Sequence, residues 1–380
     1  MFISLQLHTH IGIIFKPAPK KSLNNSFSYL FMKKNIRGIQ LNQKPLYMKK
    51  ILLAIVLFPC LCSAQYTYKN LEVNFLEKSN ESSTYTYGNL RIYPIRAKEN
   101  FKKEFASVGK YMTLNEAIVK NKIKITESGN GGTVNNLVIE NISKDTIIII
   151  TGDVVKGGKQ DRIVSQDIVL SPSSGKKSLP VYCVESGRWS SDQSSAANIS
   201  TRNNVTLNNN KPEAEFNGYY NKGSVSLRKV VEKEKDQSKV WSKVDELNSA
   251  NKTTTSTKTY TAMTQSAEFK KKLYQYLSFF KNRFDKDSSV VGVVVVTGDK
   301  VIGCDMFATH DLFLKQFESL LHSYATEAIV TGKPVNITTA TVKSYTDKLL
   351  ASESVQQVTL KEKGSSFSEK GKKLRVSAFD

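Results

Sequence analysis

Short runs in which apolar and polar residues alternate follow residue 70. Alternation of this kind, bounded by Gly, Asn and Ser, is typical of half-buried β-strands. It predicts strands at residues 89–97, 122–128, 135–143 and 146–152. Between them, residues 112–122 have a helical pattern, with Thr113 as the N-cap and Glu116 at the capping-box position. Residues 65–189 are therefore predicted to form an antiparallel, sandwich-like, β-rich half.

In the second part, residues 226–380, apolar residues recur mainly every three or four positions, which is the helical period. Helices are predicted at residues 226–248, 267–284, 310–329 and 338–351. An apolar run, a Gly-Asp turn and a second apolar run predict a β-hairpin at residues 290–307. Two short strands are predicted at residues 356–362 and 373–379. This mixed helix and hairpin half would pack with the β-rich half, which makes the expected fold class α+β.

Ser and Asn dominate residues 190–225, where apolar residues are few. Such a composition predicts a linker loop between the two halves. A second polar stretch, residues 251–266, follows the first predicted helix. Limited proteolysis is expected to cut first within one of these two stretches.

The N-terminal region contains a pattern typical of export. Residues 48–65 begin with Met and two lysines, continue with an apolar run and end in small residues up to Ala64. This order predicts a secretory signal peptide over residues 48–64, with cleavage after Ala64. The apolar run is shorter than the ~20 residues that cross a membrane, so no transmembrane span is expected after cleavage. Residues 1–47 would precede the true start at Met48, and the protein is expected to be periplasmic or secreted.

The formal net charge of +21 comes partly from this region. Nine of the 55 basic residues and none of the 34 acidic ones lie in residues 1–64, which leaves 46 basic residues against 34 acidic ones. In the remaining chain the lysines alternate with acids instead of forming a basic block. We therefore expect no nucleic-acid partner.

Two cysteines, Cys183 and Cys304, follow the predicted cleavage site. In an exported protein they could form one disulfide, but two buried thiols would explain them equally well. No group of Cys, His, Asp and Glu has the clustered spacing of a zinc site. We expect neither a metal nor a cofactor.

Residues 152–162 join two apolar runs through a turn that contains Gly158-Lys159. A Walker loop has four residues between its first Gly and its Gly-Lys pair, and a Ser or Thr directly after that pair. Here five residues separate Gly152 from Gly158, and Gln160 stands in place of the hydroxyl residue. A strand is predicted next, so no helix N-terminus is available to hold a phosphate. The segment is therefore an ordinary hairpin or part of another kind of site.

Several segments, taken in order, resemble the ARG and Rhodanese-Phosphatase-superfamily-associated protein domain over about residues 70–330. The family takes its name from gene neighbours that include ADP-ribosylglycohydrolases, so the resemblance implies no particular activity. It does suggest that Asp305, on the return strand of the predicted hairpin, completes a site with residues of the first half. The segments are 111–127, 136–143, 152–189, 237–241 and 291–329.

Charged and polar residues are expected to meet at one end of the predicted sheet. The strand at 163–170 and the strand that runs into 183–189 are joined by a short connection, which suits antiparallel neighbours. A guanidinium, a carboxylate and an indole there could bind a polar or anionic ligand, although an Arg-Glu pair beside a covering Trp would explain the same residues. The candidate ligand-binding residues are Lys159, Gln160, Arg162, Glu185, Arg188 and Trp189, together with Asp305. Alanine at Arg162 or Arg188 is expected to abolish binding and leave thermal stability nearly unchanged.

Two classes of function remain open. The first, which we favour, is a non-catalytic ligand-binding or interaction module of the cell envelope, whose partner is an unknown polar or anionic ligand or an envelope protein. The second is a hydrolase that acts on a sugar or an ADP-ribose-like, nucleotide-derived substrate, with Asp153, Asp161 or Glu185 as acid and base. Carboxylates held in surface ion pairs would favour the first class, and a carboxylate pair about 5–9.5 Å apart would favour the second.

Overall fold

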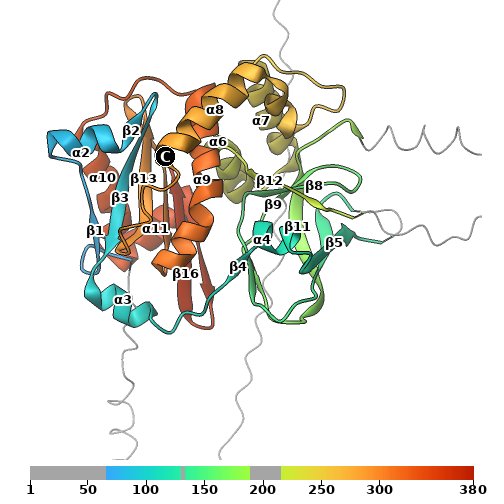
Figure 1. Ribbon diagram of the computed structural model, residues 1–380, viewed down its shortest axis with the longest axis horizontal. Coiled ribbons are helices and arrows are strands. Elements are labelled where there is room, and N and C mark those ends of the chain that lie inside the picture. The colour runs from blue at the N-terminus through green and yellow to red at the C-terminus, as the bar shows by residue number, and fades with distance from the viewer. Residues whose placement is uncertain (1–65, 130–132, 189–214) are drawn as a thin grey trace, which may run out of the picture. The chain divides into compact units, whose positions relative to one another are not determined.

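The computed structural model describes residues 66–129, 133–188 and 215–380 (Figure 1). The predicted signal peptide, the segment before it, Trp189 and most of the predicted linker lie outside these ranges. Strands dominate the first half and most of the long helices lie in the second. The predicted α+β fold class is confirmed.

The larger sheet has seven strands and combines the two ends of the described chain. Its order is β1-β3-β13-β14-β16-β15, with β2 paired to β3, and neighbouring strands are antiparallel. The predicted hairpin forms its centre, where every residue of β13 is buried, as a nearly continuous run of valines requires. The strands are β1 (Leu71–Val73), β2 (Thr86–Tyr87), β3 (Leu90–Ala97), β13 (Val290–Thr297), β14 (Lys300–Phe307), β15 (Gly364–Glu369) and β16 (Lys372–Phe379).

Helices cover this sheet and form the larger hydrophobic core with it. Helix α9 packs on β3, β13 and β14, α10 packs on β14, and α11 packs on β15 and β16. Helix α8 packs on α9. The helices are α2 (Ser79–Thr84), α3 (Glu99–Phe105), α8 (Ala267–Phe280), α9 (His310–Val330), α10 (Thr339–Leu350) and α11 (Glu353–Lys363).

A second hydrophobic core lies among the remaining strands. A six-stranded sheet has the order β12-β8-β9-β11-β6-β5, and a three-stranded sheet has the order β10-β7-β4, in which β4 and β7 are parallel. The predicted capping box between Thr113 and Glu116 begins helix α4 (Leu114–Val119). The strands are β4 (Met112–Thr113), β5 (Ile123–Glu127), β6 (Asn136–Asn141), β7 (Ile147–Ile149), β8 (Asp153–Lys156), β9 (Arg162–Val164), β10 (Ile168–Leu170), β11 (Gly175–Cys183) and β12 (Gly218–Lys222).

The single helix predicted at 226–248 is wrong, because the segment is broken. Helix α6 (Val225–Lys229) passes directly into a π-helix, η1 (Val230–Glu234). Lys235 then adopts a left-handed backbone conformation with φ 51°, and Asp236 caps α7 (Gln237–Ala250). The extra residue in a π-turn leaves the apolar positions near helical spacing, so periodicity alone does not reveal the break. A short 3-10 helix, η2 (Tyr260–Gln265), follows.

Three other predicted elements differ from the structure. Residues 356–362 lie in α11, where Gln356 and Leu360, four positions apart, face the core. Residues 218–222, assigned to the linker, form β12 and pair with β8. The strand predicted at 163–170 is divided into β9 and β10 by a bend at residues 165–167.

Candidate functional site

Residues 157–161 form a tight turn between β8 and β9. Gly158 has a φ of +51°, and a Cβ atom there would lie 2.3 Å from the Phe216 ring, so the position requires glycine. Four backbone N–H groups of the turn already donate to protein acceptors, which leaves none of the four for a phosphate. The Gly157 N–H donates to Asp161 Oδ1, the Gly158 N–H to the Glu215 carbonyl, the Lys159 N–H to Glu127 Oε1, and the Asp161 N–H to Glu185 Oε2. The segment is a hairpin.

The turn lies beside the end of β11, because β9 and β11 pair antiparallel with Arg162 opposite Cys183. The Arg188 guanidinium lies 3.1 Å from Asp161 Oδ1 and 2.9 Å from Glu185 Oε2. Gln160 Oε1 accepts a hydrogen bond from the Cys183 thiol at 3.0 Å. Five of the predicted site residues are thus brought to one end of the sheet: Lys159, Gln160, Arg162, Glu185 and Arg188. The sixth, Trp189, lies outside the described residues.

The side chains of this cluster mainly contact one another. Gln160, Asp161, Arg162 and Glu185 are 3, 4, 0 and 4% exposed. Arg162 donates to the Gln160 carbonyl and lies 3.5 Å from the Glu127 carboxylate. Burial raises the pKa of Asp161, and the negative charge of Glu185 adds to the rise. The contacts stabilise the sheet end. Ligand binding by this cluster stays a prediction.

Asp305 lies in a different cluster, which corrects the expectation that it completes this site. It accepts hydrogen bonds from Arg228 at 2.6 and 3.1 Å and from the Tyr324 hydroxyl at 2.6 Å. Burial alone would raise the pKa of Asp305, but the charge and hydrogen bonds of Arg228, with smaller effects of Arg375 and Tyr324, lower it to about 2. Asp305 is therefore a buried structural anion that joins α6 and α9 to β14.

A second buried guanidinium, that of Arg375 on β16, holds two more carboxylates. It lies 2.9 Å from Asp167 in the β9–β10 bend and 2.8 Å from Glu232 in the π-helix. Its distance to Asp305 is 3.8 Å. Because these residues come from distant parts of the sequence, one cation fixes the bend and the π-helix on the larger sheet.

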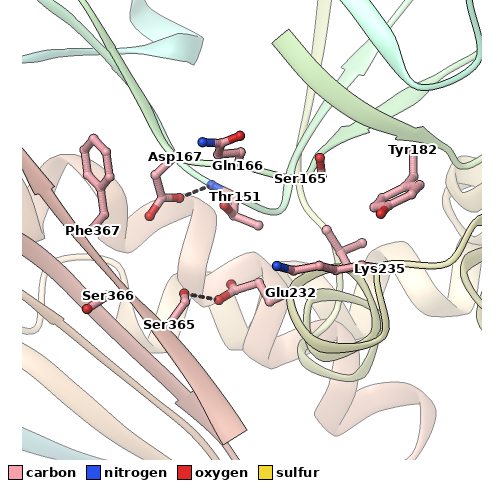
Figure 2. A pocket seen from close by; sticks show the side chains of 11 residues that line it. Thr151, Ser165, Gln166, Asp167, Tyr182, Glu232, Lys235, Ser365, Ser366 and Phe367 are labelled. Carbon is pink, nitrogen blue, oxygen red and sulfur yellow. Dashed lines mark hydrogen bonds between the residues drawn. The ribbon is translucent and has the colours of Figure 1, made fainter. Parts of the chain in front are cut away.

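A cavity of about 430 Å³ lies where the β9–β10 bend, the π-helix and strand β15 of the larger sheet meet (Figure 2). Tyr182 and Phe367 stand at opposite ends of it in the view, with hydroxyl, amide and carboxylate groups between them. Asp167 accepts a hydrogen bond from the Thr151 N–H at 2.6 Å, and Glu232 accepts one from the Ser365 hydroxyl. The lining residues are Thr151, Ser165, Gln166, Asp167, Tyr182, Val231, Glu232, Lys235, Ser365, Ser366 and Phe367.

Lys235 is the cation of this lining. Its left-handed backbone conformation, at the end of the π-helix, directs its side chain into the cavity (Figure 2). Within residues 66–129, 133–188 and 215–380 its ammonium group forms no ion pair, whereas Asp167 and Glu232 are both paired with Arg375. π-helical turns occur frequently at functional sites. Sequence reasoning missed Lys235 because an exposed lysine inside a helical pattern has no distinguishing signal.

A family model described as the ARG and Rhodanese-Phosphatase-superfamily-associated Protein domain matches residues 79–378. The chain belongs to this family. The matched range contains the whole of both smaller sheets and all but β1 and the end of β16 of the larger one, so the domain includes the cavity and the 157–188 cluster. No curated protein and no solved structure matches the chain.

Several other chemical features follow from the described ranges. Cys183 and Cys304 are both buried free thiols there, and burial raises the pKa of Cys183 to about 11. Among the same residues no group of three or more His, Cys, Asp and Glu side chains is placed to hold a metal ion. None of the helices described is long and apolar enough to cross a membrane.

Proposed function

We propose that this protein is an exported, non-catalytic ligand-binding module of the cell envelope and that the cavity beside Lys235 binds an anionic ligand. The observation that carries the proposal is the position of the Lys235 ammonium group in the lining. Both carboxylates of the lining, Asp167 and Glu232, are held in ion pairs by Arg375, whereas Lys235 forms no ion pair within the described residues and can pair with a ligand. Ser and Gln side chains beside it supply hydrogen bonds, and Tyr182 and Phe367 supply apolar surface.

The carboxylates proposed for a hydrolase have partners that do not favour acid–base catalysis. Asp153 accepts hydrogen bonds from Lys222 at 2.5 Å and from Tyr219 at 3.0 Å. Asp161 and Glu185 share one nitrogen of Arg188, and both are buried. A general acid or base needs an oxygen within reach of a substrate. These contacts support a binding module over a hydrolase.

Export is supported by the sequence pattern at residues 48–65. We expect the mature protein to begin at Gln65 after cleavage behind Ala64. N-terminal sequencing of the exported form tests this. A mature terminus at Cys60 or Cys62 carrying lipid would contradict it, as would a full-length protein that stays inside the cell.

The proposed binding site is tested with N-acetylglutamate α-amide and, in a separate arm, inorganic phosphate. The uncharged control is N-acetylglutamine α-amide. A ligand at tenfold its Kd stabilises the folded state by about 1.4 kcal/mol, which thermal denaturation detects. One of the two anions should raise the melting temperature of the native protein, and the uncharged control should not.

Two lysine variants localise the effect. Lys235→Met should abolish it. Lys252→Met is the matched control, since Lys252 is also exposed and also has a left-handed backbone, with a φ of 52°. Equal responses of the two variants would refute the proposed site.

A further inference from the structure

Strand β15, which borders the cavity through Ser365, Ser366 and Phe367, is an edge strand. Its sheet partner is β16, and it is the last strand in the order of the larger sheet. Edge strands present unpaired N–H and C=O groups that can pair with a further strand. Lys and Pro, which usually block such pairing, are absent from β15, although a bulge follows Phe367.

The direction of each backbone group in β15 follows from the register. The Leu374 carbonyl accepts a hydrogen bond from Ala308 N–H, so this carbonyl points away from β15. The N–H of the same trans peptide belongs to Arg375 and points the opposite way, so Arg375 and, two residues further on, Ser377 face β15 opposite Phe367 and Ser365. Gly364 and Ser366 must then face outward.

Two contacts agree with this assignment at Gly364. Its carbonyl accepts a hydrogen bond from the Lys233 ammonium at 3.1 Å, and its N–H donates to the Leu360 carbonyl. Both partners lie outside the sheet. At Ser366, by contrast, the outward N–H and C=O have no hydrogen-bond partner among the residues that the structure describes. Ser366 therefore offers one donor and one acceptor beside the cavity.

We infer that the ligand of the cavity is an extended peptide that adds to β15 as a further strand and places a carboxylate side chain beside Lys235. This inference rests on the proposed function, because it uses the same cavity and the same lysine. The backbone of one peptide residue pairs with Ser366 through two hydrogen bonds. An alternate side chain of the peptide then points to Lys235, while its neighbours contact Phe367 or Tyr182.

The probe is the peptide acetyl-Thr-Val-Glu-Val-Thr-amide, and its glutamine analogue is the uncharged control. Two further analogues carry methyl groups on alternate backbone nitrogens, one analogue in each of the two possible registers. A methyl group blocks pairing where the nitrogen faces β15 and is harmless where it faces solvent. With the wild-type protein, one methylated analogue should bind like the parent peptide and the other about tenfold or more weakly. Equal binding of the two analogues would overturn the inference.

Variants of Ser366 test the edge from the protein side. Ser366→Pro removes the outward N–H without removing a bond to β16, and should weaken binding of the parent peptide about tenfold. Ser366→Ala, which retains the N–H, should bind like wild type. Should the proline variant fail to fold, the methylated analogues still decide the question with the wild-type protein.

The outcomes separate this inference from the proposed function. If Ser366→Pro binds the peptide normally and Lys235→Met does not, strand addition is wrong and the anion site stands. If Lys235→Met and Lys252→Met both bind normally, the proposed site itself is wrong. A concentration-dependent dimer that Ser366→Pro abolishes, without peptide binding by the wild type, would show that β15 pairs with a second copy and would overturn the peptide inference.

Discussion

Arg228→Met should destabilise the protein strongly although it lies outside the cavity. The Arg228 side chain is 0% exposed and donates two hydrogen bonds to Asp305 and one to Ser377. Methionine retains most of the apolar stem but leaves Asp305 as a buried carboxylate with the Tyr324 hydroxyl and a more distant Arg375. Loss of one partner of a buried ion pair costs about 3–5 kcal/mol. This is a large fraction of the roughly 5–15 kcal/mol that stabilises a typical domain.

The pH dependence of this loss identifies its cause. In the wild type the pKa of Asp305 is lowered from 3.8 to about 2. The ionised carboxylate therefore adds to the free energy of unfolding, fully above pH 3.8, and this addition is lost as the pH falls toward 2. Without Arg228, burial should raise the pKa of Asp305 above 3.8, and the effect of the carboxylate on stability changes sign. The ionised carboxylate then destabilises the variant as the pH rises.

Urea denaturation of both proteins at pH 4 and pH 7 measures the effect. We expect a larger difference in unfolding free energy at pH 7 than at pH 4. The double variant Arg228→Met/Asp305→Leu should recover part of the loss, since it buries no unpaired charge. Lys102→Met, which breaks an exposed pair with Glu99, is the control and should leave the midpoint unchanged. A loss in Arg228→Met that is the same at both pH values would refute the reasoning.

Further predictions concern the 157–188 cluster and one buried histidine. Arg162→Ala should lower stability by about 3 kcal/mol or more, because Glu127 stays buried without its partner. Arg188→Ala should lower it less, because the Arg188 side chain is 30% exposed; equal melting temperatures of the two variants would contradict this. Gly158→Ala should lower the urea midpoint more than Gly371→Ala, because both glycines have positive φ but only a Cβ at Gly158 would clash. Burial lowers the pKa of His322 from 6.5 to about 4, so below pH 6.5 the unfolded chain binds a proton that the folded protein does not. Stability should therefore fall by up to about 3 kcal/mol as the pH falls from 6.5 to 4, and His322→Phe should flatten that slope.

Local patterns in the sequence predicted those elements that are specified by residues close to one another along the chain. The capping box at Thr113 and the valine-rich hairpin at 290–307 are both present in the structure. The antiparallel pairing of β9 with β11 followed from the short connection between them, and it brought Arg162 and Glu185 to one sheet end as expected. What the pattern did not reveal was burial, which makes Arg162 structural instead of accessible.

Long-range pairing was beyond the reach of the sequence. Strand β3 pairs with β13 although almost 200 residues separate them, and no local property of either strand specifies the other. The cavity depends on the same kind of contact, since Arg375 joins Asp167 and Glu232 across the fold. The strand predicted at residues 356–362 is instead part of helix α11, because Gln356 and Leu360, four positions apart, both face the core.

The central claim is that the Lys235 cavity and the β15 edge, not the 157–162 turn, bind the ligand. Hydrogen exchange of individual backbone amides, followed by NMR with and without a saturating amount of acetyl-Thr-Val-Glu-Val-Thr-amide, tests it most directly. The account predicts that exchange slows at Ser366, whose N–H faces outward, with smaller changes at residues 165–167 and Lys235. Slower exchange at residues 157–162 and 185–188 instead, or no change at any amide, would contradict it.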